Sequence, residues 1–179
     1  MKKIYLLILL LFFSTLSFSQ KIKNLDNQNG YKKLKFLTNI SKIKNLKLNE
    51  LINNSTLSEE IYYDYTGNDL QYFGNVKIED IMLSFINNKL YSIQIGFGNP
   101  YDSFSIDEFN VIKNLLTVNY GNNYFNCGTN DEKLECIIWD GLNVRCEFLR
   151  LQYNNKEYSD FNNIYGYILL KYKPLVERK

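Results

Sequence analysis

The chain contains no histidine and no alanine, and it has only three cysteines and two prolines. Cysteine hydrolases need an imidazole to supply or stabilise the thiolate, so the absence of histidine argues against that class. Tetrahedral zinc sites need four cysteine or histidine ligands, and three cysteines spaced nine and ten residues apart do not resemble the close pairs of such sites. The C-x-x-C spacing of thiol redox enzymes is also missing. We therefore expect no cofactor, no metal and no catalytic residue.

Asn, Lys, Ile, Tyr and Phe are abundant instead, and all five have codons rich in A and T. A biased genome explains the 15 tyrosines and 12 phenylalanines, so their number alone is no evidence for a sugar- or base-binding platform. An exposed aromatic cluster would still indicate binding.

The N-terminus, "MKKIYLLILLLFFSTLSFSQ", is typical of a secretory signal peptide. Lys2 and Lys3 precede an apolar run over residues 4–13, and small residues at Ser17 and Ser19 suit a signal peptidase. An uncleaved anchor is the alternative, but the apolar run is about half of the roughly 20 residues that span a membrane. We expect residues 1–19 to be removed, leaving an exported protein, periplasmic or secreted, without stable membrane insertion.

Export makes a disulfide the best interpretation of the cysteines. Cys136 and Cys146 flank a predicted hairpin, and an odd-membered loop near Asp140-Gly141 would place them on one face of it. We favour this pair. A two-residue turn would instead put the two cysteines on opposite faces, and Cys127 would then pair with Cys136.

Charge argues against nucleic acid as a partner. Removing Lys2 and Lys3 leaves 19 of the 21 basic side chains against 19 acidic ones, a formal net charge of zero. Such a chain has no strongly basic field to hold phosphates. Residues 20–50 are lysine-rich and residues 51–140 hold most of the acids, which could steer a partner, although a solvated face explains such runs more simply.

Periodicity predicts the secondary structure. We expect strands over residues 31–37 and 60–66, a helix over 41–53, and an antiparallel hairpin turning at residues 87–89. A better-marked helix follows Ser105, which forms a capping box with Glu108, and Gly121 ends it. Further strands are predicted over residues 134–140, 142–153 and 164–172.

These elements predict an α+β fold in which an antiparallel sheet of six to seven strands carries two amphipathic helices on one face. We expect residues 20–30 to form a disordered lead and residues 31–179 a single domain. Asn-Asn-Lys turns at residues 87–89 and 154–156 leave open a tandem α-β-β-β arrangement.

The sequence resembles no family that we can name, and three functions remain. The first is a non-catalytic protein-binding module of the cell envelope, with an inhibitor or immunity-like role as one version. Its expected contacts are the aromatic strand with Tyr62, Tyr63 and Tyr65, and the acidic loop with Asp131 and Glu132. The second is a carbohydrate binder or a glycan hydrolase that uses paired carboxylates. The third is a structural component of the envelope.

Overall fold

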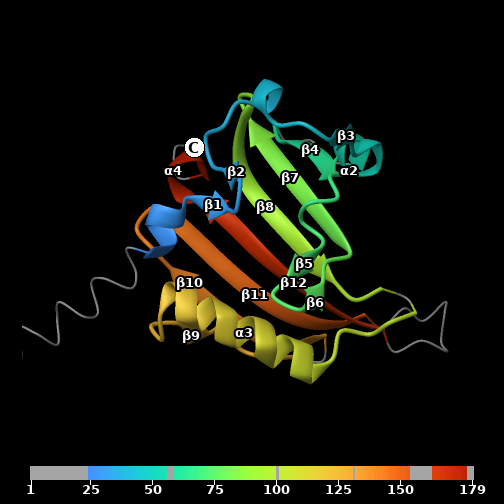
Figure 1. The fold of residues 1–179 in the computed structure, drawn as a ribbon, viewed down its shortest axis with the longest axis vertical. Coiled ribbons are helices and arrows are strands. Elements are labelled where there is room, and N and C mark those ends of the chain that lie inside the picture. Colours follow the sequence, from blue (N-terminus) through green and yellow to red (C-terminus); the bar gives the residue numbers. More distant parts are fainter. Residues whose placement is uncertain (1–23, 56–58, 100, 131, 154–162, 177–179) are drawn as a thin grey trace, which may run out of the picture.

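An eight-stranded antiparallel sheet, in the order β3-β4-β7-β8-β12-β11-β10-β9, forms the body of the protein (Figure 1). The computed structural model describes residues 24–55, 59–99, 101–130, 132–153 and 163–176. The strands of the main sheet are β3 (Leu46–Leu48), β4 (Ile61–Tyr65), β7 (Asp80–Ile86), β8 (Lys89–Phe97), β9 (Phe125–Asn126), β10 (Lys133–Asp140), β11 (Val144–Tyr153) and β12 (Asn163–Tyr172). Strands β4-β7-β8 and β10-β11-β12 are two meanders that meet where β8 pairs with β12.

The hairpin between β7 and β8 confirms the prediction around residues 87–89. Asn87 and Asn88 both have positive φ, 49° and 61°, and Ile86 pairs with Lys89. Two consecutive left-handed residues are the requirement of the two-residue turn whose twist matches that of the flanking strands, and asparagine tolerates this conformation. Alternation then sends Leu83 and Ile93 into the core, where both are fully buried.

Helix α3 (Ile106–Tyr120) begins and ends where the sequence predicted. The Ser105 Oγ accepts a hydrogen bond from the Glu108 amide at 3.2 Å, and the Glu108 carboxylate accepts one from the Ser105 amide at 2.9 Å. Gly121 ends the helix with φ 96°. The residues that α3 buries against the sheet are Phe109, Ile112, Leu116 and Tyr120.

The predicted helix over residues 41–53 is wrong. This stretch forms a short 3-10 helix η1 (Ile40–Lys42), strand β3 and the six-residue helix α2 (Glu50–Ser55). Asn45 has φ 62°, which breaks a right-handed helix, and the Asn49 side chain accepts a hydrogen bond from the Ile52 amide at 3.1 Å, starting α2 afresh. Asparagine side chains compete in this way with helical backbone bonds, so the apolar spacing misled the prediction.

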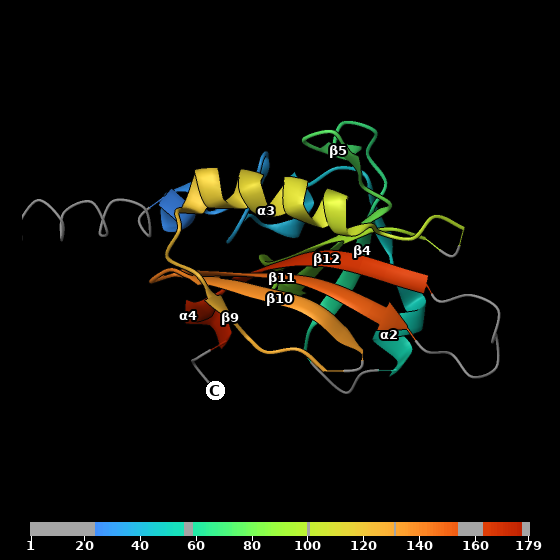
Figure 2. The same ribbon diagram turned by 90° about the horizontal axis from the view of Figure 1, so that it is seen from below.

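Two small hairpins lie on the same side of the main sheet as α3 (Figure 2). They are formed by β1 (Gly30–Tyr31) with β2 (Leu34–Lys35), and by β5 (Tyr72–Phe73) with β6 (Val76–Lys77). Helix α2 and the short α4 (Lys173–Val176) lie on the other side, near its two ends.

Residues 24–30 belong to the fold, so the expected disordered lead is wrong for this part of 20–30. Residues 24–28 are helical, and Leu25 is only 2% exposed. Asp26 binds the turn between β10 and β11: its carboxylate accepts hydrogen bonds from the amides of Leu142, Asn143 and Val144, each at 2.8 Å. Residues 20–23 lie outside the described part of the chain.

The α+β class with an antiparallel sheet is therefore confirmed. The main sheet has eight strands rather than six to seven, and α3 is the one substantial helix of the described residues. The second expected helix is reduced to α2, which does not share a face with α3 (Figure 2).

Candidate functional site

Strand β4 divides the three tyrosines that the sequence analysis grouped into one contact surface. Tyr65 is 8% exposed and belongs to the core, and Tyr63 packs edge-on against Phe85. Tyr62 points to the opposite side of the sheet, where its hydroxyl donates to the Glu60 carboxylate. Successive side chains of a strand face opposite ways, so Tyr62 lies on one face of the sheet and Tyr63 and Tyr65 on the other. Their role as contacts for a partner stays a prediction.

The acidic loop lies far from these tyrosines. Glu132 is exposed just before β10, while Asp131 lies outside the described residues. Strands β7, β8, β12 and β11 separate β10 from β4 in the sheet. The tyrosines of β4 and Glu132 therefore do not form one binding surface.

The disulfide joins Cys127 to Cys136, so the favoured pairing of Cys136 with Cys146 is wrong. Gly141 bonds to Val144 across a two-residue turn, and Cys146 pairs with Trp139 in the register. This register puts Cys136 and Cys146 on opposite faces, which is the condition under which the alternative pairing was expected. Cys146 is a free thiol buried in the core, and burial raises its pKa.

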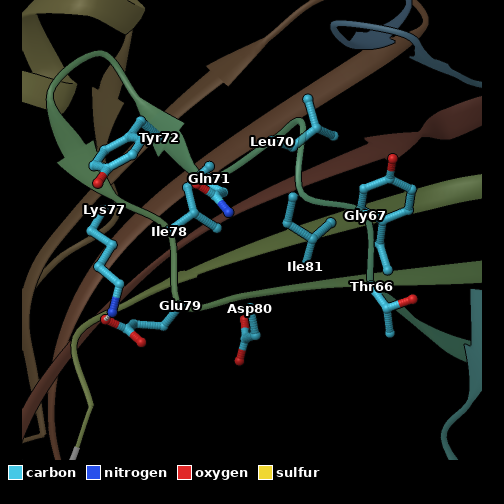
Figure 3. A pocket seen from close by; sticks show the side chains of 11 residues that line it. Thr66, Gly67, Leu70, Gln71, Tyr72, Lys77, Ile78, Glu79, Asp80 and Ile81 are labelled. Atoms are coloured by element: carbon cyan, nitrogen blue, oxygen red, sulfur yellow. Dashed lines mark hydrogen bonds and ion pairs between the residues drawn. The ribbon is translucent and has the colours of Figure 1, made fainter. Parts of the chain in front are cut away.

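A pocket of about 330 Å³ lies beside the β5–β6 hairpin (Figure 3). The pocket has an apolar lining of Leu70, Ile78 and Ile81. Its polar lining consists of Thr66, Gln71, Lys77, Glu79 and Asp80. Along one side the Lys77 ammonium pairs with the Glu79 carboxylate at 2.8 Å. The pocket thus offers an apolar surface together with fixed polar groups, which is the usual composition of a small-molecule site.

Two adjacent carboxylates of this pocket titrate in opposite directions. The hydrogen bond from Lys77 lowers the pKa of Glu79. Asp80 has a raised pKa, because the surrounding chain removes part of its water and because the charge of Asp64 lies nearby. One carboxylate therefore stays ionised while its neighbour keeps a proton to higher pH, an arrangement that acid–base catalysts use.

The face of the main sheet that points away from α3, here called the open face, is the second candidate site. One row of side chains crosses it through paired positions: Asp64, Met82, Gln94, Leu169, Glu147 and Ile138. A small apolar cluster of Cys136, Ile138 and Leu149 lies at one end, with Leu151 and Tyr167 packed against it.

Charge on the open face is partly neutralised. Arg145 pairs with Glu147 at 2.7 Å. The side chains of Tyr167 and Leu169 on β12 are half-buried, so part of each one is in contact with solvent. The open face therefore presents apolar and aromatic groups to the outside.

No protein family, no curated protein and no solved structure matches this chain. The site must therefore be interpreted from its own chemistry. In the part of the chain that the structure describes, no group of three or more cysteine, aspartate or glutamate side chains is placed to hold a metal ion. None of the described helices combines the length and the apolar character needed to cross a membrane.

Sequence reasoning missed Asp64 and Asp80 as neighbours. They lie 16 positions apart in the printed sequence and meet only because β4 pairs with β7, Asp64 opposite Met82. Adjacent acids such as Glu79 and Asp80 are ordinarily solvated charges, and nothing in the sequence distinguishes this pair. The sequence offered one signal for Asp80: the alternation of side chains along β7 indicates which face of the sheet this residue occupies.

Proposed function

We propose that the chain is an exported, non-catalytic binding module that contacts another protein of the cell envelope through its open face. The observation that carries this proposal is the character of that face. An antiparallel sheet with one solvated side ordinarily shows polar residues there. Here the apolar or aromatic side chains of Met82, Tyr167 and Leu169 lie half-buried on it.

The chemistry of the open face suits a protein partner. Interfaces combine an apolar and aromatic centre with a polar rim. Tyr167 and Leu169 would form the centre, and Gln94 and the Arg145–Glu147 pair would lie beside it. Such a surface needs no catalytic group, so an inhibitor or immunity-like role fits it.

Two features support the location. The N-terminal residues are typical of a secretory signal. The Cys127–Cys136 disulfide is of the kind that persists outside the reducing cytosol.

The test is affinity capture from an oxidised envelope extract with the tagged mature chain, Gln20 to Lys179. The informative variant is Leu169→Lys, which places a charge at the centre of the open face. The side-chain oxygens of its strand neighbours Glu147 and Gln94 can accept hydrogen bonds from the new ammonium group, so we expect the fold to be kept. The matched control is Val118→Lys on α3, where the side chain is 81% exposed.

We expect one stoichiometric protein partner that is lost with Leu169→Lys and retained with Val118→Lys. Circular dichroism verifies that both variants are folded. If the partner binds Leu169→Lys as well as it binds the unmodified chain, the open face is not the contact surface. Capture of no partner at all would favour a structural role in the envelope.

A second candidate function rests on the Glu79–Asp80 pair. A carbohydrate binder or carboxylate-dependent glycan hydrolase would use the pocket of Figure 3, with the ionised Glu79 and the proton-retaining Asp80 in different roles. The test is turnover of a polysaccharide by the unmodified chain and by two variants. If Asp80→Asn abolishes turnover and Leu169→Lys keeps it, this function is favoured over the binding module.

A further inference from the structure

A second pocket, of about 360 Å³, lies on the α3 side of the sheet, away from the open face. The β1–β2 hairpin, the turn of the β5–β6 hairpin and the second half of α3 border it, and these elements share one side of the sheet in Figure 2. Its apolar lining consists of Tyr31, Phe73, Leu115, Leu116 and Tyr120. The volume lies within the roughly 300 to 1,000 Å³ of small-molecule sites.

The apolar lining is held together by the chain itself. The Tyr31 ring stacks on Phe73 with centroids 5.6 Å apart, and the Tyr31 hydroxyl donates to the Tyr72 carbonyl at 3.5 Å. Gly74, with φ 65°, brings the β5–β6 turn against α3 so closely that a Cβ there would meet Leu115 at 2.5 Å. The pocket is therefore preformed, which lowers the cost of binding a ligand.

Two lysines line the same pocket. The Lys32 ammonium lies over the Tyr31 ring at 5.3 Å and donates to the Tyr72 carbonyl at 3.4 Å, and the Lys35 ammonium donates to the Gln28 carbonyl at 2.7 Å. Among the residues that the structure describes, neither ammonium forms an ion pair with a carboxylate; the neighbouring Lys33, in contrast, pairs with Asp69 at 2.5 Å.

We propose that this pocket binds a small carboxylic acid with an apolar tail, such as a medium-chain fatty acid. The tail would lie against Tyr31, Phe73 and Leu115, where burial of its CH₂ groups favours binding. The carboxylate would bind Lys32 and Lys35, whose ammonium groups donate only to backbone carbonyls in the described part of the chain. Ammonium-to-carboxylate hydrogen bonds are among the stronger polar contacts of proteins.

The charge and the lining together set the ligand class. A cation would be repelled by the ammonium groups of Lys32 and Lys35, and a neutral chain would offer them no carboxylate. A small anion without a tail, such as acetate, would leave the aromatic lining unused. This site is separate from the open face, so its test does not depend on the proposed function.

The experiment titrates the mature chain with four probes, followed by isothermal calorimetry and by the backbone amide spectrum: octanoate, octanol, octylammonium and acetate. We expect octanoate to bind at least tenfold more tightly than the other three. Shifts of the Gly74 and Asn119 amides would place it in this pocket. Octanol or octylammonium binding as tightly as octanoate, or shifts elsewhere, would overturn the proposal.

The Lys32→Gln/Lys35→Gln double variant isolates the contribution of charge. It should reduce octanoate affinity at least tenfold while leaving octanol binding unchanged. Its matched control, Lys42→Gln/Lys44→Gln, removes two exposed lysines that do not line the pocket, and it should bind octanoate like the unmodified chain. Equal losses in both double variants would indicate a general charge effect and contradict the site. Leu115→Glu, which adds a negative charge to the lining, should also abolish octanoate binding.

Discussion

Gly166 of β12 lies directly against the ring of Phe104, the residue that precedes the cap of α3. A Cβ at position 166 would overlap the ring atoms of Phe104. Phe104 also stacks on Phe97, with centroids 5.4 Å apart, and its amide donates to the Ile164 carbonyl at 2.8 Å. The Phe104 ring therefore packs the start of α3 against β12, and only glycine at position 166 leaves room for this ring.

This contact predicts the effect of adding one methyl group. Gly166→Ala should lower the free energy of unfolding by about 1 to 3 kcal/mol, the usual cost of overpacking a core. Phe104→Leu, a smaller side chain, should relieve part of this cost, so the double variant should be more stable than the sum of the two single effects predicts. Urea unfolding of the four proteins measures the coupling, and strictly additive effects would contradict the contact.

A second prediction concerns Asp26, whose carboxylate bonds to the Val144 amide 118 residues along the chain. Asp26→Asn removes one of the two carboxylate oxygens that satisfy the amides of the β10–β11 turn. The expected loss is about 1 to 3 kcal/mol, because the Leu142 amide then faces an NH₂ group instead of an acceptor and the bonds from Asn143 and Val144 lose their charge assistance. Asp102→Asn, the same change at an exposed position, should alter stability by no more than about 0.5 kcal/mol. Similar urea midpoints for both variants would contradict the role of Asp26.

The elements that the sequence predicted well are those whose signals are local. The Asn87-Asn88 turn and the Ser105 capping box each need only a few neighbouring residues, and the structure confirms both. The stretch over residues 41–53 has helical spacing, but Asn45 has a left-handed φ of 62° and the Asn49 side chain starts a new helix, and spacing reveals neither.

The candidate sites depended on strand pairing, which the sequence did not determine. One two-residue turn decides which face Cys136 occupies and thereby which cysteine it bonds to. The pKa of Asp80 is raised because the folded chain removes part of its water and because Asp64 lies on the adjacent strand. The pocket between β1–β2, β5–β6 and α3 joins three segments that lie between Gln28 and Tyr120 in the sequence, and no motif marks it.

The cysteines provide a third prediction. In the folded, oxidised protein a thiol reagent should label no cysteine at an appreciable rate, because Cys127 and Cys136 are bonded and Cys146 is buried with a raised thiol pKa. Denaturation without reduction should expose one thiol per chain. Mass spectrometry of the non-reduced digest should find the 127–136 cross-link, and a link that includes Cys146 would contradict it.

Loss of the disulfide should be measurable in its own right. Cys136→Ser should lower the free energy of unfolding by about 2 to 3 kcal/mol, the expected effect of opening so short a loop. Cys127→Ser should have a similar effect. If reducing agent shifts the urea midpoint of the unmodified chain but not that of the two serine variants, the stabilisation comes from the bond itself.

The last prediction follows from the raised pKa of Asp80. Partial loss of water, followed by the charge of Asp64, holds this pKa above its ordinary value of 3.8. The folded protein therefore keeps the proton to a higher pH than the unfolded chain does. Linkage requires that ionisation of Asp80 destabilises the fold, and that this cost develops as the pH rises from 3.8 through the raised pKa.

Asp80→Asn should consequently be more stable than the unmodified chain near neutral pH, and the difference should disappear as the pH falls below 3.8. Urea unfolding from about pH 3 to about pH 7 tests this sign. Asp64→Asn removes the neighbouring charge, so it should move the Asp80 titration, followed by carboxyl carbon NMR, to lower pH. If Asp80→Asn is less stable than the unmodified chain at neutral pH, the ionised carboxylate contributes favourable contacts and the assigned cause is wrong.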